Sequence, residues 1–185
     1  MKNEIRRQNK EKRAGMAVEE ANTKSLSAEE IFLASEFYKK AKTIMLYMPL
    51  GNETDTEEII KDAFNNGKKV IFPVTDKVTG MITPYYATKD TKFEQGAFSI
   101  SEPVDTEIAN VDDIDVFVIP GIAFDKKGAR VGFGKGCYDR LLQNCTGVKV
   151  GLCYDFQICG QIITDKHDIA MDYIVTENRF IDCTK

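Results

Sequence analysis

Two short apolar runs separated by a helix-forming segment constrain the fold of this chain more than any other feature. The runs TIMLYMP (43–49) and KKVIFPV (68–74) are typical of strands. Between them, Thr54 or Asp55 can cap a helix with an acidic first turn, and Gly67 can end it. A strand, a helix and a strand over about thirty residues form a βαβ unit, whose two strands are parallel. This unit predicts an α/β fold.

Further strand-like runs continue the alternation toward the C-terminus, at residues 81–87, 115–120, 148–154 and 172–177. A capping box at Ser27 and Glu30 predicts the start of a helix. Other helices are expected over residues 2–20 and 138–143. We therefore predict one three-layer α/β/α domain over residues 1–185, Rossmann-like, with a mostly parallel central sheet.

The composition is typical of a soluble globular protein, since 43% of the 185 residues are hydrophobic and 29% are charged. No apolar run approaches the roughly eighteen residues of a membrane span, and the start MKNEIRRQNKEKR lacks the apolar region of a signal peptide. Five cysteines without a C-x-x-C pair, and a single histidine, argue against a zinc site. We expect a cytoplasmic protein without membrane contact, monomeric or at most weakly dimeric.

Charge is unevenly distributed along the chain. Residues 1–13 carry six basic and two acidic side chains, a charge of +4, in a chain of net charge −4, so the remainder carries −8. The overall acidity argues against nucleic-acid binding. The basic N-terminal arm is either a solvated helix face or a contact for an anionic ligand.

The segment GIAFDKKGARVGFGKGCYDRLL, residues 121–142, contains five glycines and five basic residues. Its G-x-G-x-G core matches neither the Walker A loop nor the dinucleotide fingerprint. Glycines still allow backbone N–H groups to face an anion, and Arg130 and Lys135 add positive charge. The segment is either a phosphate cradle or a surface loop whose glycines serve turn geometry, and its place between a strand and a helix favours the cradle.

The same segment resembles the signature G-x-x-F-D-x-x-G-x-R-x-G-x-G-x-G-Y-Y-D of the 5-formyltetrahydrofolate cyclo-ligases, also called 5,10-methenyltetrahydrofolate synthetases. An N-terminal K-x-x-x-R, the stretch NETDTEEI and the closing motifs GLCYDFQI and HDIAMD resemble further motifs of that family, in the same order. The resemblance therefore covers almost the whole chain.

The resemblance implies an enzyme that uses ATP and Mg²⁺ to convert 5-formyltetrahydrofolate into 5,10-methenyltetrahydrofolate. ATP would phosphorylate the formyl oxygen to give an N5-iminium phosphate, and N10 would attack the activated carbon as phosphate leaves. Phosphoryl transfer of this kind depends on positioning and on cations around the transferring group. The expected partners are therefore two small molecules, the folate and ATP.

The resemblance also assigns roles to individual residues. The catalytic residues it implies are Lys135 and Arg130. The residues implied for ATP binding are Lys2, Arg6, Arg130, Gly132, Gly134, Lys135, Gly136 and Tyr138. Those implied for folate binding are Met48, Glu53, Phe133, Cys137, Tyr138 and Tyr154, with the Glu53 carboxylate accepting two pterin N–H groups. The implied Mg²⁺ ligands are Asp139 and Asp168, with Asp172 as a substitute for Asp168.

Two positions depart from the family pattern. Cys137 replaces the first of two tyrosines, and Phe133 stands where relatives often have a basic or polar residue. These changes leave two alternatives to the cyclo-ligase. One is a non-catalytic folate-binding or nucleotide-binding protein, and the other is an ATP-using enzyme on the same scaffold with another formylated or pterin-like substrate.

Overall fold

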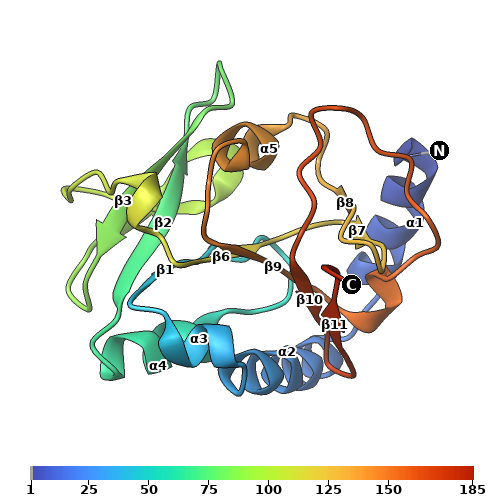
Figure 1. The fold of residues 1–185 in the computed structure, drawn as a ribbon, viewed down its shortest axis with the longest axis horizontal. Coiled ribbons are helices and arrows are strands. Elements are labelled where there is room, and N and C mark those ends of the chain that lie inside the picture. The colour runs from blue at the N-terminus through green and yellow to red at the C-terminus, as the bar shows by residue number, and fades with distance from the viewer. Residues whose placement is uncertain (1) are drawn as a thin grey trace.

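The computed structural model describes residues 2–185 and contains a central seven-stranded sheet (Figure 1). The strands, in the spatial order β11-β10-β9-β6-β1-β2-β3, are Phe180–Asp182, Tyr173–Val175, Val148–Leu152, Val116–Ile119, Thr43–Met45, Lys69–Thr75 and Ile82–Ala87. The five inner strands are parallel, and β3 and β11 are antiparallel edge strands. The predicted α/β class with a mostly parallel sheet is confirmed.

Helices cover both faces of this sheet. Their bounds are Lys2–Ala14 for α1, Val18–Leu33 for α2, Glu36–Lys40 for α3, Glu57–Asn65 for α4 and Cys137–Leu142 for α5. In Figure 1, α2, α3 and α4 lie together on one side and α5 lies on the other. Helix α1 packs against the short hairpin of β7 (Ala123–Phe124) and β8 (Arg130–Val131). None of the described helices is long and apolar enough to cross a membrane.

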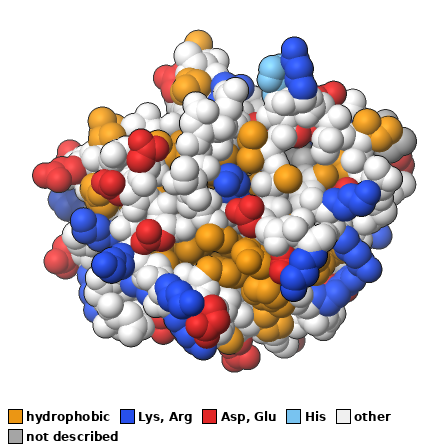
Figure 2. Space-filling view, viewed as in Figure 1, with side chains coloured by type: hydrophobic (Ala, Val, Ile, Leu, Met, Phe, Trp, Pro, Cys, Tyr) orange, Lys and Arg blue, Asp and Glu red, His pale blue; other side chains and the backbone are white. Residues whose placement is uncertain are grey.

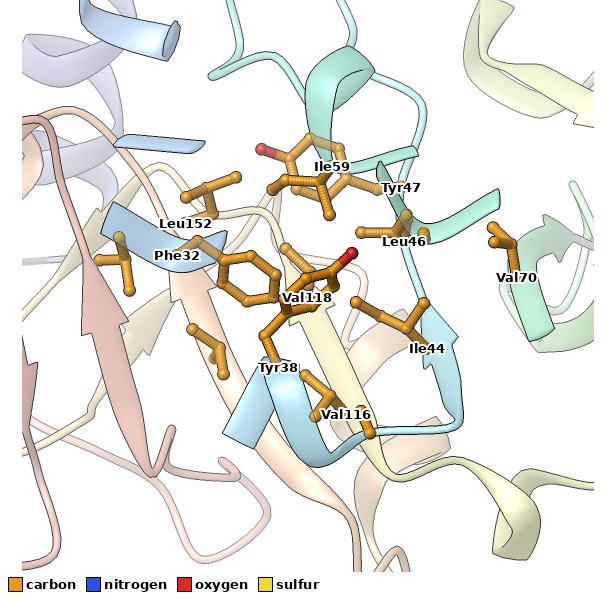
Figure 3. Close-up of a cluster of buried hydrophobic side chains, with 14 of the residues drawn as sticks. Phe32, Tyr38, Ile44, Leu46, Tyr47, Ile59, Val70, Val116, Val118 and Leu152 are labelled. Atoms are coloured by element: carbon orange, nitrogen blue, oxygen red, sulfur yellow. The ribbon is translucent and has the colours of Figure 1, made fainter. Parts of the chain in front are cut away.

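Two apolar clusters hold the layers together, one on each face of the sheet. Figure 3 shows the first, in which Phe32 and Tyr38 from the helices contact strand residues such as Val118. The second cluster, around Phe117, Phe124 and other residues of the opposite face, packs under α5. At the surface, Figure 2 shows apolar side chains gathered where α3 and the β10–β11 edge lie in Figure 1, and charges of both signs around them.

The predicted helix start at Ser27 is wrong. Helix α2 begins at Val18, after an extended Ala17, and Ser27 lies within it, donating its hydroxyl to the Thr23 carbonyl at 3.2 Å. The residues before Ser27 are helical because Ala21 and Ser25 are buried on the face that packs against the fold. Tertiary burial therefore extends the helix past a local capping pattern.

The start of α4 is capped from two sources. Asp55, one of the two predicted caps, accepts the Thr56 and Glu57 N–H groups at 2.7 and 3.1 Å. The next two N–H groups, of Glu58 and Ile59, donate to the carboxylate of Glu29 at 2.9 and 3.2 Å. Glu29 comes from α2, so this long-range cap fixes the end of the loop between β1 and α4.

A further hairpin that the sequence patterns did not predict lies beside β2. It consists of β4 (Phe93–Gln95) and β5 (Ser101–Pro103), joined by a 3₁₀ turn at Ala97–Ser99. Two residues of this connection, Phe98 and Ser99, have φ of 56° and 64°. The hairpin matters for the site because its connection forms one wall of the cavity described below.

Candidate active site

A large cavity of about 530 Å³ lies beyond the carboxyl ends of β1, β2 and β6, where open parallel sheets place their ligands. Its walls come from α1, the loop after β1, the β4–β5 connection and the glycine-rich segment. The predicted site residues that border it are Lys2, Arg6, Met48, Glu53, Arg130, Gly132, Phe133, Gly134, Lys135, Gly136, Cys137, Tyr138, Asp139 and Asp168. Segments distant in sequence therefore meet around one space.

The glycine-rich segment turns along the cavity between β8 and α5. Gly134 has φ of +101° and Gly136 has φ of +63°. A side chain in this left-handed region would cost roughly 1–2 kcal/mol, so glycine is favoured at both positions. Gly136 directly precedes α5, and the loop can approach an anion closely with its backbone.

Arg130 is a buried cation at the base of this loop. Its side chain is 5% exposed, and its Nη2 donates to Asp139 Oδ2 at 3.0 Å. Its Nε is buried and has no hydrogen-bond partner anywhere in residues 2–185. A buried N–H without a partner costs free energy.

Lys2 and Arg6 bring charge to the same end of the cavity from α1. The Lys2 ammonium lies 2.6 Å from Asp168 and 2.9 Å from Asp165, and the bond to Asp168 raises the pKa of Lys2. Burial alone would raise the pKa of Asp168, but hydrogen bonds from Lys2 and the Asp165 N–H outweigh burial and lower it. Arg6 Nε donates to the Gly132 carbonyl at 2.8 Å, so α1 is fixed against the glycine loop.

Lys135 contacts an aromatic ring instead of a carboxylate. Its ammonium lies 3.9 Å from the centroid of the Phe98 ring, on the β4–β5 connection. The left-handed backbone of Phe98 and Ser99 is a form of strain that proteins tend to retain at functional sites. A cation–π contact leaves the charge of Lys135 available to an anionic ligand.

Glu53 occupies another part of the cavity wall, on the loop after β1. It is 9% exposed, its Oε2 accepts the Leu50 N–H at 2.9 Å, and its Oε1 lies 3.6 Å from Arg13 Nη1. Burial raises the pKa of Glu53, whereas the Leu50 N–H and the Arg13 charge favour the carboxylate. A carboxylate held in this way can accept two adjacent N–H groups from a flat heterocycle.

Aromatic and apolar side chains complete the walls. Tyr138 borders the cavity with the Arg130 guanidinium 5.6 Å from its ring centroid, and burial raises the pKa of its phenol, which stays neutral. Phe133 is 49% exposed, and its ring centroid lies 5.0 Å from the ammonium of Lys10. Cys137 lies close to the β2–β3 turn, since a Cβ added to Gly80 would be 3.3 Å from its sulfur.

Two expected residues do not border the cavity. Tyr154 is completely buried, where its hydroxyl pairs with Ser25 at 3.2 Å and donates to the Glu53 carbonyl at 3.3 Å. Its position supports the Glu53 loop from behind, which corrects the expectation of direct ring contact. Asp172 accepts the Lys149 N–H at 2.8 Å beside the sheet, so Asp168 is the member of that pair that reaches the cavity.

Sequence reasoning missed Arg13 and Phe98. Arg13 had an available signal, because Lys2, Arg6 and Arg13 fall on one stripe of a helix. Phe98 had none, because nothing local indicates that residues 93–103 form a hairpin whose connection folds back over the glycine loop. These two residues contact Glu53 and Lys135, respectively.

The carboxylates at the cavity fit a hard cation only if a ligand completes its coordination. Within residues 2–185, no group of three or more Asp, Glu, His or Cys side chains is placed to hold a metal. Asp139 and Asp168 are close in the fold, since the Ile169 N–H donates to Asp139 Oδ1 at 3.1 Å. Two carboxylates with water and phosphate oxygens form the donor set that Mg²⁺ commonly uses.

Comparisons with known proteins find relatives that are similar over almost the whole chain. The chain is 30% identical to the 5-formyltetrahydrofolate cyclo-ligase of Mus musculus over 94% of its length and 92% of the mouse protein. Its fold is similar to the Aquifex aeolicus 5,10-methenyltetrahydrofolate synthetase, with a TM-score of 0.87 and 36% identity, covering 100% of this chain and 93% of the other. The Mycoplasma pneumoniae 5,10-methenyltetrahydrofolate synthetase gives a TM-score of 0.76 at 27% identity, covering 95% and 98%. Residues 1–177 match the family model, and the chain belongs to the 5-formyltetrahydrofolate cyclo-ligase family.

Proposed function

We propose that this protein converts 5-formyltetrahydrofolate into 5,10-methenyltetrahydrofolate with consumption of ATP. The observation that carries the proposal is the cavity itself, which joins a cationic glycine loop to a buried carboxylate within one space of about 530 Å³. A binding site for an anionic phosphate donor and a binding site for a heterocycle are therefore adjacent. Family membership over residues 1–177 supports the same activity.

Glu53 and its neighbours form the proposed folate end. The amino-pyrimidinone edge of a pterin presents adjacent N–H donors, which the Glu53 carboxylate would accept as a pair. Met48 and Tyr138 supply apolar surface beside it, and Cys137 and Phe133 border the same cavity. Burial of Glu53 strengthens such hydrogen bonds because it excludes competing water.

The glycine loop and its cations form the proposed triphosphate end. Gly132, Gly134 and Gly136 would receive the phosphates, with Lys2, Arg6, Arg130 and Lys135 around them. Lys135 and Arg130 would stabilise the charge that develops as the γ-phosphoryl group moves to the formyl oxygen. The P–O bond to ADP breaks, N10 then attacks the activated carbon and loses its proton, and phosphate leaves as the ring closes.

Asp139 and Asp168 would hold Mg²⁺ together with phosphate oxygens. The ion would neutralise phosphate charge while ATP is bound. In the structure these carboxylates pair with Arg130 and Lys2. Binding of ATP with its metal is therefore expected to exchange those ion pairs, so that the carboxylates face the metal and the cations face the phosphates.

The proposal extends to the setting of the enzyme. All five cysteines are free thiols, as expected of a cytoplasmic protein. Residues from near both ends of the chain, Lys2 and Asp168, border the same cavity, which supports a single domain that acts as a monomer on two small molecules.

One assay tests the function directly. The purified protein, ATP, Mg²⁺ and 5-formyltetrahydrofolate are mixed, and the near-ultraviolet absorbance of the conjugated methenyl product is followed together with ADP release. We expect equal amounts of both products, and none when either substrate is omitted. Tight folate binding without turnover would indicate a binding protein, and ADP release without folate conversion would indicate another substrate.

A further inference from the structure

Helix α1 presents a row of polar side chains to the rest of the fold. Lys2, Arg6, Asn9 and Arg13 recur at helical spacing and so lie on one side of the helix. From Lys2 to Arg13 the helix rises roughly 16 Å, at about 1.5 Å per residue. The row is thus long enough to reach from one end of a substrate-sized cavity to the other.

Each member of this row contacts a different part of the site or its support. Lys2 pairs with Asp168, and Arg6 donates to the Gly132 carbonyl at the triphosphate end. Asn9 is buried and donates to the Ile122 carbonyl at 3.1 Å, at the start of the glycine-rich segment. Arg13, the last member, reaches Glu53 instead.

Arg13 is held beside Glu53, behind the cavity wall, by several contacts. Its side chain is 12% exposed, and its Nη1 lies 3.6 Å from the Glu53 carboxylate, whose side chain is 6% exposed. Its guanidinium carbon lies 6.0 Å from the centroid of the Phe133 ring. Its carbonyl accepts the Asn52 side-chain amide at 3.1 Å, which ties the end of α1 to the loop that carries Glu53.

The other groups around Glu53 do not supply a compensating charge. The titratable side chains that approach it are Tyr47 from the segment after β1, Tyr138 from α5 and Tyr154 from the segment after β9. Burial raises the pKa of each of these phenols, so all three are neutral near pH 7. The Leu50 N–H is a dipole, and in the described part of the chain Arg13 supplies the ion pair of Glu53.

We propose that Arg13 is a positioning residue that keeps the Glu53 carboxylate ionised and aimed into the cavity, so that α1 supports both substrate sites. This inference rests on the proposed function, because it assumes that Glu53 accepts the pterin N–H groups. Without the Arg13 charge, burial would favour the neutral carboxyl, which cannot accept two N–H groups in the same way. Folate binding would then weaken as the pH falls.

The test compares Arg13→Ala with Arg13→Lys, which retains the charge, and with Arg7→Ala as a control. Arg7 lies on the outer face of α1, paired with exposed Glu4 and Glu11. We expect Arg13→Ala to raise the KM for 5-formyltetrahydrofolate about tenfold at pH 7, which corresponds to one unit of pKa or of log affinity. The loss should be larger at pH 6 than at pH 8, kcat and the KM for ATP should change less than twofold, and Arg13→Lys should recover most of the affinity.

A direct titration separates this inference from the proposed function. The Glu53 carboxyl is followed by carbon-13 NMR in the ligand-free protein, with Glu53→Gln to assign its signal. A higher Glu53 pKa in Arg13→Ala than in the wild type supports the positioning role. If neither the wild type nor any variant turns over the folate, the proposed function is refuted, but the positioning role is not. An unchanged Glu53 titration and unchanged folate affinity in folded Arg13→Ala would overturn the inference. If Arg13→Ala does not fold, Arg13→Gln, which keeps a similar length without charge, is measured in its place by the same criteria.

Discussion

The two ends of the cavity are organised in opposite ways. At the proposed triphosphate end, Arg130 and Lys2 are paired with Asp139 and Asp168, so a nucleotide bound there would have to exchange existing ion pairs. At the folate end, Glu53 is already buried and held by a backbone N–H and Arg13. On the proposed assignment, a ligand would have to reorganise the first end, whereas the second end is already preorganised. We therefore expect that removing a charged side chain lowers kcat at the triphosphate end and weakens substrate binding at the folate end.

The largest expected effect comes from removing Lys135. Lys135→Ala should lower kcat by about 10²-fold to 10³-fold, because the ammonium would act on charge that develops during phosphoryl transfer. The KM for the folate should change little, and the circular dichroism spectrum should remain that of the wild type. Steady-state kinetics with both substrates varied measure these quantities.

The control for Lys135 is Lys126→Ala, which removes an exposed lysine of the same glycine-rich segment outside the cavity lining. Its kinetics should match the wild type. If Lys135→Ala raised KM for the folate and left kcat intact, Lys135 would belong to binding at the preorganised end, and the contrast between the two ends would be lost.

The second effect concerns affinity at the folate end. Glu53→Gln should weaken 5-formyltetrahydrofolate binding by about 10-fold to 50-fold, since a charged acceptor is replaced by a neutral one with a single carbonyl oxygen. ATP binding should stay within twofold of the wild type, as measured by calorimetric titration of each ligand. Glu57→Gln, in the exposed first turn of α4, is the matched control. Weaker ATP binding with intact folate binding would contradict the pterin role.

The two ends also differ in how far the sequence predicts them. The triphosphate end is largely a local structure, because the glycines, Arg130, Lys135 and Asp139 lie within ten residues of one another between a strand and a helix. Motif and spacing therefore bring these residues to one place. The parallel sheet is predictable for a related reason, since apolar runs alternating with helices leave few other arrangements.

The folate end depends on contacts between distant segments. Arg13 meets Glu53 because α1 packs against the loop after β1. The Asn52 side-chain amide on that loop donates to the Arg13 carbonyl and holds the two together. Tyr154, expected at the cavity, is turned into the core beneath that loop, where Ser25 and the Glu53 carbonyl satisfy its hydroxyl. The same tertiary packing extends α2 past the predicted cap at Ser27. Long-range burial determines these features, and no short pattern encodes it.

A third effect sharpens the idea that the folate end is preorganised. Glu29 is 1% exposed and caps α4, and burial raises its pKa to about 7, against 4.5 in an unfolded chain. Between these values the folded state binds more protons than the unfolded state, so stability falls as pH rises from about 4.5 to 7. Glu29→Gln keeps an acceptor for the helix and should remove this loss, which is about 3 kcal/mol for a pKa difference of this size.

Urea unfolding at pH 5 and pH 8 measures the effect, with Glu30→Gln as the exposed neighbour on the same helix. The free energy of unfolding should depend less on pH in Glu29→Gln than in the wild type or the control. Equal pH dependence in all three proteins would contradict this prediction. It would show that the Glu29 carboxyl ionises as in water, and that its contact with the first turn of α4 is open to solvent.

The smallest expected effect lies at Cys137, between the two ends. Cys137→Tyr introduces the tyrosine of the signature that this segment resembles, and the added ring can extend into the cavity that Cys137 borders instead of into the core. We therefore expect kcat/KM within about threefold of the wild type, a change of roughly 0.6 kcal/mol that is typical of substitutions outside the core. Cys137→Ser, which keeps the size, is the control.

A large loss of activity with a lower melting temperature in Cys137→Tyr alone would contradict this prediction. It would show that the β2–β3 turn at Gly80 leaves no room for a larger side chain at residue 137. The wall between the two ends would then be as preorganised as the folate end, and only the ion pairs of Lys2 and Arg130 would remain for the ligand to rearrange.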